Sequence, residues 1–139
     1  MRIEPYLDFN GRAEEAIEFY KRSLNAEVTR LMRFKDAPPG ACGPGGITPG
    51  TENKVMHASL QVGETLLMLS DGRMQGPTKF GGISLSLGVS TDEQANRAFA
   101  ALSEGGQVCV PLSKTFFASS FGMVTDKFGV TWMVIAGTK

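Results

Sequence analysis

The sequence predicts an α+β fold in which two βαβββ modules form a curved mixed sheet around a cleft. The order of strand then helix occurs twice, first near Ile3 and again near Ile83, and three further strand candidates follow each helix. Segments rich in glycine and proline interrupt this pattern at 36–53 and 72–82. One helix covers only one face of a four-stranded sheet, so we expect the modules to pair around a shared concavity.

Two-residue alternation indicates the strands of the first module. Within residues 3–9, Leu7 and Phe9 alternate with Tyr6 and Asp8, which is typical of a strand with one buried face. The further strand candidates of this module are residues 26–34, 54–62 and 65–71. The segment VGET, between the last two of these, predicts a hairpin turn.

The helix of the first module is predicted over residues 10–25. Asn10 is placed to cap its start, and Asn25 suits a left-handed exit. The apolar residues at helical spacing are Ala13, Ala16, Ile17, Tyr20 and Leu24.

The helix of the second module is predicted from the segment STDEQANRAFAALSEGG. Its start fits a capping box, made either by Ser90 with Glu93 or by Thr91 with Gln94. Two consecutive glycines end the helix. Its apolar stripe consists of Ala95, Ala98, Phe99 and Leu102.

The strands of the second module are predicted over residues 83–89, 107–112, 115–125 and 130–136. Before the last strand, Asp126 and Gly129 bracket a tight turn. In that strand we expect Trp132 to face the helix and Met133 to face the concavity. The last two strands also hold an aromatic group, interpreted first as core: Phe116, Phe117, Phe121 and Trp132.

The chain has the length of one domain, so we expect residues 1–139 to form a single domain. Module one covers about 1–72, a connector about 73–82, and module two about 83–139. The segment 36–53 is predicted to be a long loop, of the kind that forms a lid or stays disordered.

Charge and hydropathy exclude several classes of partner. The 14 basic and 14 acidic residues balance, so no field of one sign attracts nucleic acid or an anionic membrane. No apolar run reaches the roughly 20 residues that cross a bilayer, and the first residues contain no signal-peptide hydrophobic region. We therefore expect a cytoplasmic protein with no nucleic-acid or membrane partner.

The two cysteines, Cys42 and Cys109, lie in different segments without Cys-x-x-Cys spacing. This argues against both a disulfide scaffold and a structural zinc site. We interpret them as small apolar filler, although Cys42 lies in a loop where its thiol could be exposed.

Three segments carry a resemblance to a known family: PYLDFNGRAEEAIEFYKRSLNAEV, VMHASLQVGETLLMLSDG and SSFGMVTDKFGVTWMV. Together they resemble the PhnB-like branch of the vicinal oxygen chelate superfamily, also called the glyoxalase/bleomycin resistance protein superfamily. Some members carry the label 3-demethylubiquinone-9 3-methyltransferase, although this chain has no glycine-rich nucleotide loop after a strand. The resemblance implies the glyoxalase/bleomycin resistance fold and a homodimer.

Superfamily enzymes hold a divalent metal with His or Glu residues on the outer strands of each module, and this chain departs from that set. Ser84 replaces a ligand His, and Met133 replaces a Glu in the final strand. Met68 or Leu69 stands in place of a carboxylate, while Glu4 or Tyr6 falls near the first ligand position. Hydroxyl and thioether groups are weak ligands for such ions, so we expect no metal and no cofactor.

His57 is the only histidine, and it lies in a strand where His57, Ser59 and Gln61 alternate with apolar residues. The polar set is predicted to face the cavity, where an imidazole can hydrogen-bond or act as a base. The alternative is that His57 only satisfies a backbone carbonyl at the rim. The residues predicted to line the ligand pocket are Tyr6, Asp8, His57, Ser59, Gln61, Ser84, Ser86, Phe117, Phe121 and Met133.

These observations predict a protein that binds a small molecule in the cleft between modules, without the superfamily metal site. The alternative is a metal-dependent lyase, dioxygenase or thiol transferase whose ligands have moved, with His57 and Glu4 as candidates. No catalytic residue is assigned.

Overall fold

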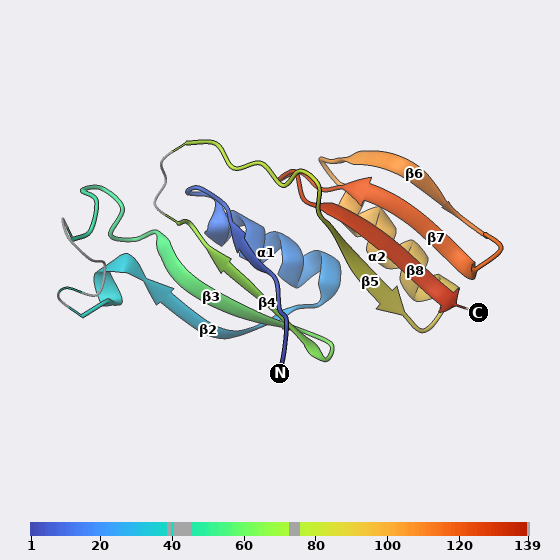
Figure 1. Cartoon of the computed structure of the whole chain (residues 1–139), viewed down its shortest axis with the longest axis horizontal. Helices are drawn as coiled ribbons and strands as arrows, with labels where there is room; N and C mark the ends of the chain where they lie inside the picture. Colours follow the sequence, from blue (N-terminus) through green and yellow to red (C-terminus); the bar gives the residue numbers. More distant parts are fainter. Residues whose placement is uncertain (39, 41–45, 73–75, 139) are drawn as a thin grey trace. The chain divides into compact units, whose positions relative to one another are not determined.

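The computed structural model describes residues 1–38, 40, 46–72 and 76–138. The chain divides into two compact units, Met1–Thr78 and Lys79–Lys139. Each unit has the order strand, helix and three strands, and its four strands form one mixed sheet (Figure 1). The predicted α+β fold with two βαβββ modules is therefore confirmed.

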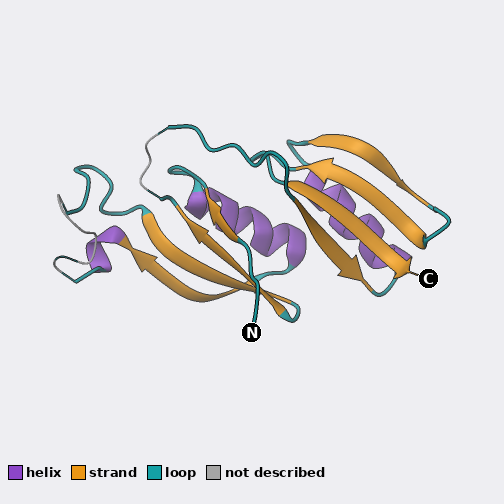
Figure 2. Ribbon diagram, in the orientation of Figure 1, coloured by secondary structure: helices purple, strands orange, loops and turns teal. Residues whose placement is uncertain are grey.

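The sheet of the first unit has the strand order β1-β4-β3-β2. Its strands are β1 (Tyr6–Asp8), β2 (Glu27–Arg33), β3 (Val55–Val62) and β4 (Thr65–Ser70). Strand β1 pairs with β4 in parallel, and the other neighbours are antiparallel. A short 3-10 helix, η1 (Phe34–Asp36), follows β2, and the helix α1 (Ala13–Leu24) covers one face of the sheet (Figure 2).

The apolar stripe of α1 meets the apolar side of β3 and β4. Ala58, Leu60 and Leu69 are fully buried on the side of the sheet that α1 covers. The buried residues of α1 are Ala13, Ala16, Ile17, Phe19 and Tyr20, which matches the predicted stripe except that Phe19 joins it and Leu24 is only half-buried. At the C-terminal end, Asn25 adopts the predicted left-handed conformation.

The prediction that Asn10 caps α1 is wrong. Arg12 occupies the N-cap position, and no side chain of the neighbouring residues caps the helix. Instead, the buried carboxylate of Asp71, just after β4, accepts hydrogen bonds of 2.8 Å from the backbone N–H groups of Gly11 and Ala13. Its other oxygen accepts a 2.8 Å bond from Val55 N, so one side chain joins the helix start to β3.

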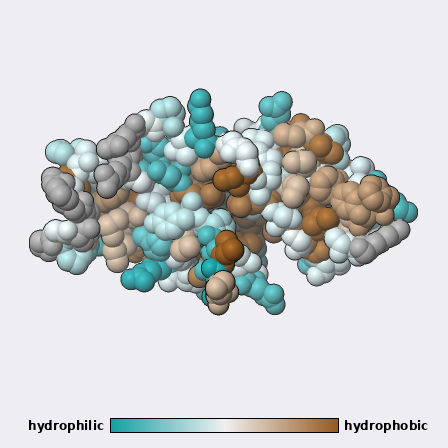
Figure 3. Space-filling model, viewed as in Figure 1, coloured by the Kyte–Doolittle hydropathy of each residue, from teal (hydrophilic) through white to brown (hydrophobic). Residues whose placement is uncertain are grey.

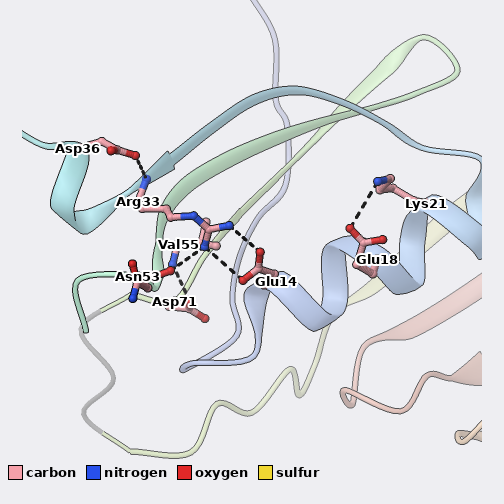
Figure 4. A network of polar contacts seen from close by, with 8 residues as sticks. All are labelled: Glu14, Glu18, Lys21, Arg33, Asp36, Asn53, Val55 and Asp71. Atoms are coloured by element: carbon pink, nitrogen blue, oxygen red, sulfur yellow. Dashed lines mark hydrogen bonds and ion pairs between the residues drawn. The ribbon is translucent and has the colours of Figure 1, made fainter. Parts of the chain in front are cut away.

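An ion pair joins α1 to the end of β2 (Figure 4). Arg33 donates from Nη2 to Glu14 Oε2 at 2.6 Å and from Nη1 to Glu14 Oε1 at 3.2 Å. The same guanidinium donates to the backbone oxygen of Asn53 at 2.6 Å. Arg33 therefore joins the helix, the strand end and the residues that precede β3.

The second unit repeats this topology with the strand order β5-β8-β7-β6. Its elements are β5 (Ser84–Val89), α2 (Asp92–Ser103), β6 (Gln107–Ser113), β7 (Ala118–Thr125) and β8 (Thr131–Thr138). The helix starts with a capping box in which Gln94 N donates to Thr91 Oγ1 at 3.1 Å, so the second of the two predicted boxes is the one that forms.

The turn between β7 and β8 is built on Asp126, as predicted. The carboxylate accepts hydrogen bonds from the backbone of Phe128 and Val130, at 2.9 Å and 3.1 Å, and from Trp132 Nε1 at 2.9 Å. Trp132 is 4% exposed and belongs to the buried set of β8, whereas Met133 points to the opposite face of the sheet.

Two core interpretations do not hold, those of Phe116 and of Cys109. Phe116 and Phe117 precede β7 rather than lying in it, and Phe116 is 88% exposed. Cys109 is exposed on the edge strand β6, because this strand has a neighbour on one side only. Cys42 lies outside the described residues.

The surface differs between the two units. In the view of Figure 3, hydrophobic side chains gather over β6, β7 and β8, while hydrophilic side chains are prominent over the first unit. Val108, Val110 and Phe116 are among the large apolar side chains exposed in the second unit. None of the described helices has the length and apolarity that spanning a membrane requires.

Candidate functional site

The face of the first sheet opposite α1 carries the predicted polar residues of the first module. We call it the open face of the first unit. Strand register places one row of side chains across it, consisting of Tyr6, Met68, Ser59 and Arg30. The adjacent row consists of Asp8, Ser70, His57 and Met32. Each of the four strands thus carries at least one polar side chain on this face.

Tyr6, His57 and Ser59 form a continuous hydrogen-bonded chain on this face. The Tyr6 hydroxyl lies 3.0 Å from His57 Nδ1, and His57 Nε2 lies 3.0 Å from Ser59 Oγ. The two rings are tilted, with centroids 5.5 Å apart. Tyr6 reaches across β4 to make this contact, because β4 lies between β1 and β3 in the sheet. Both nitrogens of the imidazole are therefore occupied.

The environment favours the neutral form of His57. Partial burial lowers the pKa of its imidazole from the ordinary value of 6.5, and the nearby positive charge of Arg30 lowers it further. A neutral ring uses one nitrogen as a donor and the other as an acceptor, so the Tyr6 and Ser59 hydroxyls must take complementary roles. If the Tyr6 hydroxyl changes from donor to acceptor, His57 and the Ser59 hydroxyl must therefore exchange their donor and acceptor roles as well.

Two other predicted pocket residues serve local turns. Asp8 Oδ1 accepts a hydrogen bond of 2.9 Å from Asn10 N, and its carboxylate lies against the backbone of Gly72. Gln61 Nε2 donates to the backbone oxygen of Gly63 at 2.8 Å, within the β3–β4 hairpin. Asp8 is the last residue of β1, and Gln61 lies next to the β3–β4 turn, so both contacts are local.

The face of the second sheet opposite α2 brings the remaining predicted residues together within their own unit. Ser86 pairs with Met133, and Met133 pairs with Met123. The preceding residue of this face on β5 is Ser84, which pairs with Thr131. Phe121 pairs with Ile135 on the same face. Phe117 stacks edge-on against Phe121, with ring centroids 5.1 Å apart. This face passes from hydroxyls through thioethers to aromatic rings.

Metal-ligating side chains in the described part of the chain do not converge on either face. Among the described residues, no group of three or more His, Cys, Asp or Glu side chains could hold a metal ion. Of the two residues considered for a ligand position in β4, Met68 shares the open face with Tyr6, and Leu69 is fully buried on the other side. A hydroxyl and a thioether therefore occupy paired positions in each unit, with Tyr6 beside Met68 and Ser86 beside Met133.

Arg30 is the residue of this site that sequence reasoning missed. Strict alternation from Val28, which pairs with the buried Leu60, would put Arg30 on the helix side of the sheet. A β-bulge between Val28 and Arg30 shifts the register, so Arg30 pairs with Ser59 and shares the face of His57. The sequence offers no local signal for this bulge, since it arises from pairing with a distant strand.

Comparison with known proteins gives consistent matches over almost the whole chain. A family model described as 3-demethylubiquinone-9 3-methyltransferase matches residues 1–135. Protein YjdN of Escherichia coli strain K12 is 34% identical over 140 residues, an alignment that covers 96% of this chain and 94% of YjdN.

Solved structures give the same result. Protein PA1353 from Pseudomonas aeruginosa is 40% identical, with a TM-score of 0.85 over 100% of this chain and 99% of that one. A PhnB protein from Bacillus cereus is 27% identical, with a TM-score of 0.79 over 99% of this chain and 100% of that one. A glyoxylase/bleomycin resistance protein/dioxygenase domain from Frankia sp. EAN1pec is 14% identical, with a TM-score of 0.66 over 100% of this chain and 93% of that one. This likeness concerns the fold alone.

Proposed function

The chain belongs to the 3-demethylubiquinone-9 3-methyltransferase family, the PhnB-like branch of the vicinal oxygen chelate superfamily, and from this premise we propose that it binds a small organic molecule on the open face of the first sheet. The observation that carries the proposal is the Tyr6–His57–Ser59 chain. Fixing an imidazole through both nitrogens orders two further side chains, a conformational cost that hydrogen bonds to water do not carry.

The residues around this chain suit a ligand with an apolar body and a polar end. Met68 and Met32 supply flexible apolar contacts beside the imidazole, because both share its face. The Tyr6 ring is 53% exposed and offers both a flat apolar surface and a hydroxyl. A small molecule laid against this face would exchange water for thioether and aromatic contacts while its polar atom met the hydroxyl.

Because the chain has one histidine, its ring resonances report on this site alone. We would titrate the protein with small aromatic compounds that carry a carbonyl, carboxylate or phenol group and follow the ring nitrogens of His57 by NMR. Binders should shift these resonances. Tyr6→Phe should weaken the affinity for the binders about threefold to tenfold, the range of one hydrogen bond. Arg22→Gln, on the exposed side of α1, serves as the control.

The proposal fails if no compound shifts His57, or if His57→Ala, measured by isothermal titration calorimetry, and Tyr6→Phe bind the compounds as tightly as the unmodified protein does. Ser86→Ala and Phe121→Ala, both on the open face of the second sheet, test whether that surface also contributes to affinity. An effect of these changes alone would move the site to the second unit and contradict the proposal.

We also propose a homodimer, which the family relationship and the exposed apolar side chains of the second unit support. Val108, Val110 and Phe116 leave apolar surface in contact with water, and association would remove part of it. Sedimentation equilibrium at micromolar concentration tests this. A monomer alone at that concentration contradicts it.

A further inference from the structure

Arg30 stands beside the His57 site, and among the described residues it has no counter-ion. It is exposed, and none of the ion pairs found in the described part of the chain includes it. Arg30 lies on β2, which pairs directly with the strand of His57, β3, and paired strands are about 4.8 Å apart. The positive charge of Arg30 contributes to lowering the pKa of the His57 imidazole. This guanidinium is available to a negative group at the site.

Tyr6 lies on the other side of the same imidazole. The two hydroxyls and the neutral ring hold three protons, and the two hydrogen bonds between them use only two. The third proton remains either on Ser59 or on Tyr6, depending on the direction of the chain. Ser59 is 8% exposed, whereas Tyr6 is 53% exposed, so an external acceptor reaches the Tyr6 end.

We infer that the open face of the first unit selects small organic carboxylates, with the Arg30 guanidinium and the Tyr6 hydroxyl as the two donors on either side of His57. This inference rests on the proposed function and names the class of ligand for the same site. An anion at Tyr6 accepts the hydroxyl proton, which directs the chain so that Ser59 donates to Nε2 and Nδ1 donates to Tyr6.

The anion is coupled to the proton on His57. Protonation turns both nitrogens of the His57 ring into donors, so the Tyr6 hydroxyl accepts from Nδ1 and its own proton is free for the anion. Protonation also adds a positive charge beside Arg30. Carboxylate affinity therefore rises as the pH falls through the titration of His57. The acidic groups that register places on this face are Asp8 on β1 and Glu27 on β2, and they oppose anion binding; Glu4, before β1, is paired with Arg2. Strand β4 presents Leu66, Met68 and Ser70 here, which carry no charge.

The test compares carboxylates with their uncharged amides: benzoate with benzamide, and pyruvate with pyruvamide. Dissociation constants come from the His57 ring shifts in the unmodified protein and in Arg30→Gln, Arg30→Lys, Tyr6→Phe and the control Arg22→Gln. Thermal denaturation confirms that each variant is folded. Arg30→Lys keeps the charge and loses the planar donor pair, so it separates the two contributions.

We expect each carboxylate to bind at least about fivefold more tightly than its amide. Arg30→Gln should weaken the carboxylates about fivefold to tenfold, the range of a partly exposed charge-assisted hydrogen bond, and change the amides less than twofold. Arg22→Gln should change neither, and only the carboxylates should bind more tightly at lower pH.

Two failures are distinguishable. If amides bind as well as carboxylates and shift His57, or if Arg30→Gln leaves carboxylate binding unchanged, this inference is overturned while the proposed function stands. If neither class shifts His57, both are overturned.

Discussion

The indole Nε1 of Trp132 donates a hydrogen bond of 2.9 Å to Asp126 Oδ2, which links the start of β8 to the turn that precedes it. Both residues are buried, with 4% and 3% of their surface exposed. The other carboxylate oxygen holds the backbone of Phe128 and Val130, so a single side chain sets the turn and positions the first buried residue of the last strand.

Asp126→Asn should lower the free energy of unfolding by about 3 kcal/mol. An asparagine in the same position places an N–H₂ group against at least one of three donors, and a buried donor without an acceptor costs about 1–3 kcal/mol. Urea denaturation measures the change. Trp132→Phe removes the indole donor and also leaves a cavity beside it, so it does not isolate the hydrogen bond. A cost of Asp126→Asn below about 1 kcal/mol would contradict this account of the turn.

Asp71→Asn should destabilise the start of α1 by about 3 kcal/mol. The carboxylate is 1% exposed and accepts from Gly11, Ala13 and Val55, so the amide again opposes a donor. Hydrogen exchange should accelerate at these three amides. Asn10→Ala is the matched comparison, since it changes the residue that the sequence pattern favours as the cap. If Asn10→Ala affects the exchange of Gly11 and Ala13 more than Asp71→Asn does, our assignment of the cap is wrong.

Asp92 contributes a pH-dependent link between α2 and β7. Hydrogen bonds from Ser119 and then Ser120 lower the pKa of its carboxyl below the ordinary value of 3.8. A lowered folded-state pKa means that the stabilisation is present above pH 3.8 and is lost as the pH falls through the folded-state value. Carboxyl NMR titration should place Asp92 below 3.8 and show an upward shift in Ser119→Ala/Ser120→Ala. Ser84→Ala should leave it unchanged; an unshifted Asp92 in the double variant would refute the link.

The Glu14–Arg33 pair is expected to be worth about 0.5 kcal/mol, because Glu14 is 61% exposed and solvent screens the attraction. A double-mutant cycle with Glu14→Gln and Arg33→Gln measures this coupling. Arg33→Gln alone should cost more than Glu14→Gln, since it also removes the bond to Asn53 O. The Arg33 hydrogen bond lowers the pKa of Glu14 from 4.5, so Arg33→Gln should raise it. Equal costs for the two single changes would contradict the role of the Asn53 contact.

His57 should titrate below 6.5, and the unfolded chain should bind its proton more readily than the folded protein does. Stability from this group is therefore complete above pH 6.5 and declines as the pH falls from 6.5 toward the folded-state pKa. Arg30→Gln should raise the pKa only part of the way, because burial is the larger cause and Arg30 the smaller. NMR titration of the single histidine measures its pKa in the unmodified protein and in Arg30→Gln. A return to 6.5 in Arg30→Gln would show that burial contributes nothing.

Local patterns identified the elements wherever neighbouring residues carry the information. Alternation in β3 assigned Ala58 and Leu60 to one face and His57 to the other, because successive strand side chains point to opposite sides. The Thr91 and Gln94 spacing located the start of α2 for the same local reason. Phe116 shows the limit of this reasoning, since an aromatic residue next to a strand looks like core until the strand's first residue is known.

The sequence by itself determined the duplicated order of strands and helices, the buried side of each, and the polar character of the face that holds His57. Only the tertiary structure decided that Asp71, 60 residues from Gly11, anchors the start of α1, that Tyr6 reaches His57 across an intervening strand, and that a bulge turns Arg30 to the same face. The physical reason is that periodicity records which side of an element is apolar, whereas strand pairing between distant segments sets which polar side chains meet.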